Sequence, residues 1–198
     1  CAQLHAWQQH GSHLSVAVNL SASDVVDRQL AAYLASLLER YRLAPARLSI
    51  EVTESAVMQD VDAAMATLIE LNQLGLRIAI DDYGTGYSSL AQIKRLPVDE
   101  LKIDKSFVLA IDSQKDDLTI VSSTIEMGHS LGLRLVAEGV ENRASAELLS
   151  KLDCDYLQGY WIAKPMQADE LPAWLDNFTP LSLPHPMSSI LKTFQKKP

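Results

Sequence analysis

Two adjacent aspartates, Asp81 and Asp82, end an apolar run in the segment AIDDYGTGYSSL, residues 79–90. Neighbouring carboxylates repel each other, so a fold that keeps both ionised must neutralise them with a cation. Hard divalent ions such as Mg²⁺, Mn²⁺ and Ca²⁺ prefer oxygen ligands of this kind. The Gly-Thr-Gly that follows lets the next loop turn close to a ligand. The segment therefore predicts a divalent-metal site at the end of a strand.

Other apolar, strand-like runs also end in polar residues. Oxygen ligands are offered by Asn19, Glu51 and Glu138, and Asp104 and Gln158 stand at the ends of two further runs. Lys102 adds a positive charge for a phosphate group or an attacking water. Two metal ions about 3.5–4 Å apart suit in-line displacement at phosphorus, because they stabilise both the entering and the leaving oxygen. The pattern predicts metal-dependent chemistry on a phosphate ester.

A simpler explanation assigns these carboxylates to helix caps and surface charges. Asp81 and Asp82 would then cap a helix at 88–96, and Glu54 would belong to a capping box. That explanation has to hold at seven or eight positions at once, so we prefer a shared site. The Gly-Thr-Gly alone is weak evidence of a phosphate-binding loop, because it lacks the Gly-Lys-Ser/Thr of a P-loop and the full Gly-x-Gly-x-x-Gly of a dinucleotide fingerprint.

The elements that must position these residues alternate between short β-rich runs and longer runs of helical periodicity. Strands are expected at 14–20, 48–53, 76–80, 100–103, 133–138 and 154–159. Helices are expected at 24–41, 55–74, 88–96, 117–131, 144–152 and 168–178, the last with Pro172 in its first turn. Parallel strands need crossover connections, so this order predicts an α/β fold with a parallel sheet covered by helices.

Two parallel architectures fit this order: an open doubly wound sheet and a (β/α)8 barrel. An open sheet concentrates its ligand groups near one switch point, whereas a barrel brings the ends of all its strands to one mouth. Because every strand contributes a polar residue, the barrel is favoured. The chain shows six candidate strands and does not begin with Met. We therefore expect a fragment from which the first two barrel strands are missing.

Composition limits the class of protein. A chain of 198 residues with 47% hydrophobic and 21% charged residues can build one globular domain. The formal net charge of −8 argues against binding to duplex nucleic acid, which needs a basic face. The sequence shows neither a signal peptide nor a membrane span, and Cys1 and Cys154 have no metal-site spacing. We expect a cytoplasmic domain over 1–179 and a poorly ordered tail over 180–198.

Six motifs in unbroken order, between about residues 14 and 176, resemble an EAL domain. They are VNLS (18–21), EVTES (51–55), DDYGTGYSSL (81–90), LKIDKSFV (101–108), AEGVE (137–141) and LQGYWIAKP (157–165). EAL domains are bacterial phosphodiesterases of the second messenger cyclic di-GMP. The resemblance implies a modified (β/α)8 TIM-type barrel whose first strand is antiparallel. It also implies metal-dependent hydrolysis of cyclic di-GMP to the linear dinucleotide pGpG.

The same resemblance assigns roles at the metal site. Asn19, Glu51 and Asp81 resemble the family's ligands of the first metal ion. Asp81 is expected to bridge to a second ion, with Asp82 beside it. Mg²⁺ and Mn²⁺ are the cofactors implied.

Further roles follow from the other motifs. Lys102 resembles the residue that contacts the nucleophilic water, and Glu138 resembles the general base. Glu54 matches a glutamate that anchors the loop at 83–90, which in the family links the metal site to the dimer interface. Three positions match residues that support the second metal, its waters or the ligand: Asp104, Glu141 and Gln158.

The sequence departs from the family pattern in two places. DDYG stands where DDFG is commoner, which keeps an aromatic residue. The Glu-Ala-Leu signature is absent from the chain. It belongs on the second barrel strand, so we expect it in a segment preceding Cys1. Loss of the first two strands would expose sheet edges at 14–20 and 154–159, and exposed edges pair with other chains. A homodimer or higher oligomer is therefore expected.

Two other functions stay open. A catalytically inactive EAL-like domain would bind cyclic di-GMP as a receptor without cutting it. A purely structural domain would bind a protein partner. That interpretation gives no reason for the carboxylates at the strand ends. Flanking sensory or cyclase domains are expected in the parent protein, which could be anchored in a membrane.

Overall fold

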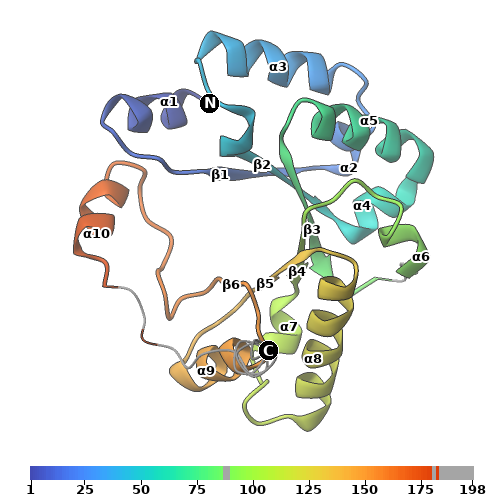
Figure 1. Ribbon diagram of the computed structural model, residues 1–198, viewed down its shortest axis with the longest axis vertical. Coiled ribbons are helices and arrows are strands. Elements are labelled where there is room, and N and C mark those ends of the chain that lie inside the picture. The colour runs from blue at the N-terminus through green and yellow to red at the C-terminus, as the bar shows by residue number, and fades with distance from the viewer. Residues whose placement is uncertain (87–89, 180–181, 183–198) are drawn as a thin grey trace, which may run out of the picture. The chain divides into compact units, whose positions relative to one another are not determined.

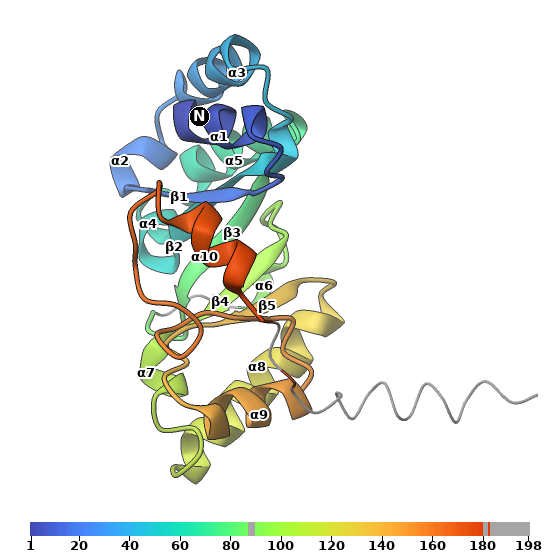
Figure 2. The same cartoon turned by 90° about the vertical axis from the view of Figure 1, so that its left-hand side faces the viewer.

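The structure is a computed structural model that describes residues 1–86, 90–179 and 182 (Figures 1 and 2). It divides into two compact units, residues 1–101 and 102–198, and each is described by itself. Part of the predicted helix 88–96 and part of the loop 83–90 lie outside the described residues. The predicted disorder of the tail 180–198 concerns residues that, apart from Ser182, also lie outside them.

The first unit contains three parallel strands and the helices between them. The strands are β1 (Val16–Leu20), β2 (Leu48–Thr53) and β3 (Arg77–Tyr83). The helices are α1 (Ala2–Gln9), α2 (Ala22–Val25), α3 (Leu30–Arg40), α4 (Glu54–Gln59), α5 (Val61–Gln73) and α6 (Leu90–Ile93), with a short 3-10 helix, η1 (Pro45–Arg47), before β2. In this unit α5 packs against β3 and α3.

Burial alternates along β2, the middle strand of this group. Leu48, Ile50 and Val52 are buried, whereas the residues between them, Ser49, Glu51 and Thr53, are partly exposed. One face of β2 therefore packs in the core, and the other carries polar groups. Strands of a parallel sheet are usually buried on both faces, and β2 departs from that rule. The polar face of β2 is the one on which Glu51 lies.

The second unit contains the rest of the sheet. Strand β4 (Glu100–Ile103) crosses the boundary between the units, and β5 (Arg134–Ala137) and β6 (Tyr156–Leu157) pair in parallel. The helices are α7 (Lys105–Val108), α8 (Lys115–Ser130), α9 (Arg143–Lys151) and α10 (Leu171–Asn177). Helix α8 packs on β5, and Pro172 lies in the first turn of α10, as predicted.

Among the described residues the strands follow chain order, β1-β2-β3-β4-β5-β6, in one sheet. The predicted α/β fold with a parallel sheet is confirmed. Two predicted helices, 24–41 and 55–74, are each divided into two. The second is divided because the side chain of Asp60 caps α5 by accepting a hydrogen bond from Ala63 N at 3.1 Å. A cap at this position starts a new helix, since it satisfies a backbone N–H that has no partner within the helix.

None of the helices within the described residues is long and apolar enough to cross a membrane.

Candidate active site

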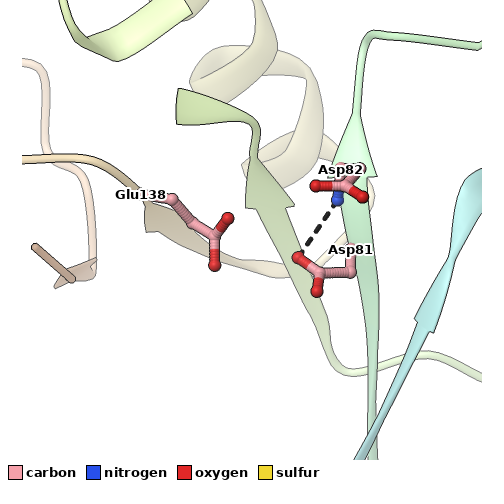
Figure 3. Close-up of side chains that lie close together, drawn as sticks. All are labelled: Asp81, Asp82 and Glu138. Carbon is pink, nitrogen blue, oxygen red and sulfur yellow. Dashed lines mark hydrogen bonds between the residues drawn. The ribbon is translucent and has the colours of Figure 1, made fainter. Parts of the chain in front are cut away.

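The end of β3 carries the two aspartates. Both side chains are partly exposed, and Asp82 N donates a hydrogen bond to Asp81 Oδ1 at 3.1 Å (Figure 3). Asp82 has φ +54°, a left-handed conformation that aspartate tolerates better than most residues. Successive side chains of a regular strand point to opposite faces, so this residue interrupts the alternation. The backbone of β3 therefore turns at the residue predicted to lie beside the metal, one position before the strand ends at Tyr83.

Strand register places three of the predicted metal ligands on one face. Asn19 is the partner of Glu51 across β1 and β2, and Glu51 is the partner of Ala79 across β2 and β3. Asp81 comes two residues after Ala79, so it lies on the same face, about 6.6 Å further along its strand. The first unit therefore aligns Asn19, Glu51 and Asp81 on neighbouring strands, all with exposed or partly exposed side chains.

An ion pair joins β4 to the end of β5 in the second unit. Lys102 Nζ lies 2.7 Å from Glu138 Oε1, and the two side chains are only 5% and 16% exposed. Glu138 follows β5 directly, and its backbone N–H donates to Ile103 O at 3.2 Å. A buried ammonium is costly unless an opposite charge compensates it, and the carboxylate of Glu138 supplies that charge. The predicted base and the predicted water-contacting lysine are therefore direct partners.

Asp104 is the N-cap of α7. Its Oδ1 accepts a hydrogen bond from Ser106 N at 2.9 Å and a short one from Ser106 Oγ, and its side chain is buried. This is the capping role that we considered for carboxylates in general, although at a different residue. Cap and ligand support do not exclude each other, because the carboxylate has a second oxygen.

Glu141 and Gln158 are both exposed in the second unit. Glu141 lies in the loop between β5 and α9. The backbone of Gln158, directly after β6, bonds to the end of β5 and to the loop that follows it. Its N–H donates to Ala137 O at 2.8 Å, and its carbonyl accepts from Val140 N at 3.0 Å. These bonds bring the loop after β5 and the residues after β6 side by side.

Glu54 is buried at 3% exposure and contacts the loop after β3. Its Oε2 accepts a hydrogen bond from Gly84 N at 3.2 Å. Burial, and in second place the charge of Glu54, raise the pKa of Tyr83 in the same loop. The capping-box interpretation of Glu54 is wrong, because α4 begins at Glu54 and its cap is Thr53, which accepts from Ala56 N at 3.2 Å.

The residues that support these groups were not among the predicted site residues. Ser106 is one, and the Asp-x-Ser spacing after β4 is a signal from which its bond to the Asp104 cap can be expected. Gly86 is another: a Cβ on this residue would lie 2.6 Å from Glu54 Oε1, so the loop passes directly over the carboxylate. No local pattern predicts that second contact, because it joins residues 32 positions apart.

Comparison with known proteins assigns the chain to a family. The family model described as the EAL domain matches residues 1–165. The chain belongs to the EAL domain family. This EAL chain is 44% identical over 174 residues to the bifunctional diguanylate cyclase/cyclic di-GMP phosphodiesterase MucR of Pseudomonas aeruginosa. That match covers 87% of the chain and 25% of MucR.

Solved EAL structures have the same fold. The MucR phosphodiesterase in complex with cyclic di-GMP matches with a TM-score of 0.82 and 44% identity, over 86% of this chain and 70% of that one. The EAL domain of Mycobacterium smegmatis DcpA matches with a TM-score of 0.85 and 36% identity, over 91% of this chain and 82% of that one. The predicted family and fold are confirmed.

The chain spans about a quarter of the length of the first curated relatives that it matches, with shares of 25%, 22% and 23%. The roles predicted for individual site residues stay predictions.

Proposed function

We propose that this EAL domain hydrolyses one phosphodiester bond of cyclic di-GMP to give pGpG, with divalent metal ions as cofactors. The relatives MucR, NbdA and PdeR are named as cyclic di-GMP phosphodiesterases, and the matching MucR structure is a complex with cyclic di-GMP. The observation that carries the proposal is the pairing of Lys102 with Glu138 at 2.7 Å, because it joins a buried cation to a carboxylate that can accept a proton.

The donor set of this chain fits Mg²⁺ or Mn²⁺. Asp81 and Asp82 offer carboxylate oxygens at the end of β3 that are able to hold a metal ion. We propose that they do so together with Asn19 and Glu51, which the strand register aligns with Asp81. Oxygen ligands without thiolate or imidazole favour Mg²⁺ and Mn²⁺ over zinc. When bound, such ions supply positive charge to the phosphate oxygens and acidify a bound water.

The chain's own residues then move the proton. Glu138 accepts a proton from the attacking water through its carboxylate. The Lys102 ammonium, 2.7 Å away, orients that carboxylate and compensates its charge in a largely buried place. The water oxygen bonds to phosphorus as the bond from phosphorus to the ribose 3′ oxygen breaks. The ring opens, the departing 3′ oxygen takes up a proton from solvent, and the product carries a 5′-phosphate and a free 3′-hydroxyl.

The test is conversion of cyclic di-GMP, followed by HPLC in the presence of Mn²⁺. It is run on this chain, on the full-length gene product that contains it, and on Glu138→Gln in both. Formation of pGpG by the unmodified protein and its loss in Glu138→Gln support the proposal. Nucleotide binding without any turnover in either length would reject it in favour of a cyclic di-GMP receptor.

We also propose that the whole protein carries sensory or cyclase domains beside this one. The length of its relatives supports this, and one of them, DosP of Escherichia coli, is named an oxygen sensor protein. A homodimer or higher oligomer stays a prediction, which light scattering of the purified protein tests.

A further inference from the structure

Gly139 follows Glu138 directly and packs against the first residue of α7. A Cβ placed on Gly139 would lie 2.6 Å from the Cβ of Lys105 and 3.2 Å from its Cα. Contacts under 3.0 Å are essentially never found for real Cβ atoms. The backbone of Gly139 also has φ +71°, in the left-handed region that glycine adopts readily. A side chain at this position would push the loop and α7 apart.

Three successive contacts run between these two segments. Lys102 Nζ pairs with Glu138 Oε1 at 2.7 Å, and Glu138 N donates to Ile103 O at 3.2 Å. The third contact is the close approach of Gly139 to Lys105. Because Glu138 and Gly139 are adjacent, any displacement of Gly139 away from Lys105 pulls on the other two contacts.

The loop is held on its other side as well. Val140 N donates to Gln158 O at 3.0 Å, and Trp161 N donates to Val140 O at 3.1 Å. A Cβ on Gly159 would lie 2.2 Å from Val140 O, so the two backbones are already in contact there. β5 lies between β4 and β6 in the sheet, so the loop after it is confined from both neighbouring strands. It cannot make room for a methyl group by moving sideways.

We propose that Gly139 is a positioning residue for the reaction. The absence of a side chain at 139 allows the loop to approach α7 closely enough to keep Glu138 beside Lys102. The inference rests on the proposed function, since it is the role of Glu138 as base that makes its position matter for turnover. Displacements of about 1 Å in a reacting group can reduce a rate by about 100-fold.

Gly132, just before β5, is a matched control for Gly139. It lies two residues before β5, as Gly139 lies two residues after it, and it has a similar φ of +79°. Among the described residues, a Cβ on Gly132 would meet nothing within 4 Å. Alanine therefore strains the backbone similarly at both positions, whereas it collides with a neighbour only at 139.

The experiment compares Gly139→Ala with Gly132→Ala by amide hydrogen exchange and by turnover. In Gly139→Ala we expect the Glu138 N–H to exchange at least about tenfold faster relative to the Leu135 N–H of the same strand, because the bond to Ile103 O opens locally. We expect kcat for cyclic di-GMP to fall at least about tenfold with KM changed less than about threefold. In Gly132→Ala the exchange ratio and kcat should stay within about twofold of the unmodified protein.

A second variant separates the collision from a general loss of folding. Lys105→Gly, added to Gly139→Ala, removes the atom that would lie at 2.6 Å. The double variant should recover the exchange ratio, or recover soluble protein if Gly139→Ala alone does not fold. Equal behaviour of the two alanine variants, or no recovery in the double variant, would overturn the inference. If the unmodified protein hydrolyses nothing, the proposed function fails, and the exchange ratio still tests the position of Glu138.

Discussion

The carboxylates at the end of β3 and those at the junction of β4 with β5 differ in burial and in their charged neighbours. At the junction, the chain provides its own cation: Lys102 lies 2.7 Å from Glu138, and both side chains are largely buried. At the end of β3, two consecutive carboxylates are partly exposed, and Asp82 adopts a left-handed backbone conformation. The junction therefore contains a buried pair of opposite charges, whereas the end of β3 carries two adjacent negative charges.

The difference separates the groups that we expect to move a proton from those that we expect to bind metal. A buried ion pair fixes orientation, because breaking it would leave a charge uncompensated. Adjacent carboxylates at a strand end repel each other, and a bound divalent cation relieves that repulsion. We therefore expect substitutions at the junction to affect turnover and substitutions at the end of β3 to affect metal affinity.

The largest effect is expected at the junction. Glu138→Gln removes the proton acceptor and keeps the shape of the side chain, so turnover should fall about 100-fold to 10⁴-fold. Binding of cyclic di-GMP, measured by calorimetry with Ca²⁺ present, should change less than about threefold.

The control for this variant is Glu147→Gln, which breaks an exposed ion pair with Arg143 at 2.7 Å on α9. It should leave turnover unchanged. Near-normal hydrolysis by Glu138→Gln would remove the distinction between the two regions.

The next largest effect is expected at the end of β3. Asp81→Asn and Asp82→Asn each remove one negative charge from the donor set and should weaken Mn²⁺ affinity at least about tenfold. Titration calorimetry with Mn²⁺ alone measures this without any need for activity. Asp62→Asn, on the exposed side of α5, is the control and should leave the affinity unchanged. An unchanged affinity in both strand-end variants would mean that these aspartates do not bind the ion.

A smaller effect is expected for the loop contact of Glu54. Glu54→Ala leaves Gly84 N without its carboxylate partner and opens a gap under Gly86, so the domain should lose about 1–3 kcal/mol of unfolding free energy. Glu54→Gln keeps an oxygen acceptor of the same size and should lose less. Chemical denaturation of the two variants makes the comparison, and equal losses would show that charge, and not the hydrogen bond, is what the site needs.

The smallest effect is expected for the burial of the Cys154 thiol in the second unit. Burial raises the pKa of the Cys154 thiol to about 12. A raised pKa keeps a thiol protonated, so at pH 8 the reactive thiolate fraction is on the order of 10⁻⁴. In a thiol titration of the native protein at pH 8, only the Cys1 thiol should therefore react promptly. The Cys154 thiol should react after the protein is unfolded. If both thiols of the native protein react promptly, the region around β6 is open to the reagent.

Much of the fold could be predicted from the sequence because it depends on local patterns. The apolar runs that became β2 and β4 have the predicted bounds, and Pro172 lies in the first turn of its helix as expected. The helix expected at 55–74 was divided, because the cap at Asp60 competes with a continuous helical pattern. Strand β6 is shorter than expected and covers Tyr156–Leu157; directly after it, the backbone of Gln158 bonds to both Ala137 and Val140.

The amino-acid sequence alone specifies which residue types stand at the strand ends and, through its motifs, the family. These features depend on periodicity and on short spacings, which a chain displays before it folds. The tertiary structure decided which of those residues become partners. The pairing of Lys102 with Glu138, the contact of Glu54 with Gly84 and Gly86, and the approach of Gly139 to Lys105 each join segments about 30 or more residues apart. Such contacts follow from strand order and close packing, and no local pattern encodes them.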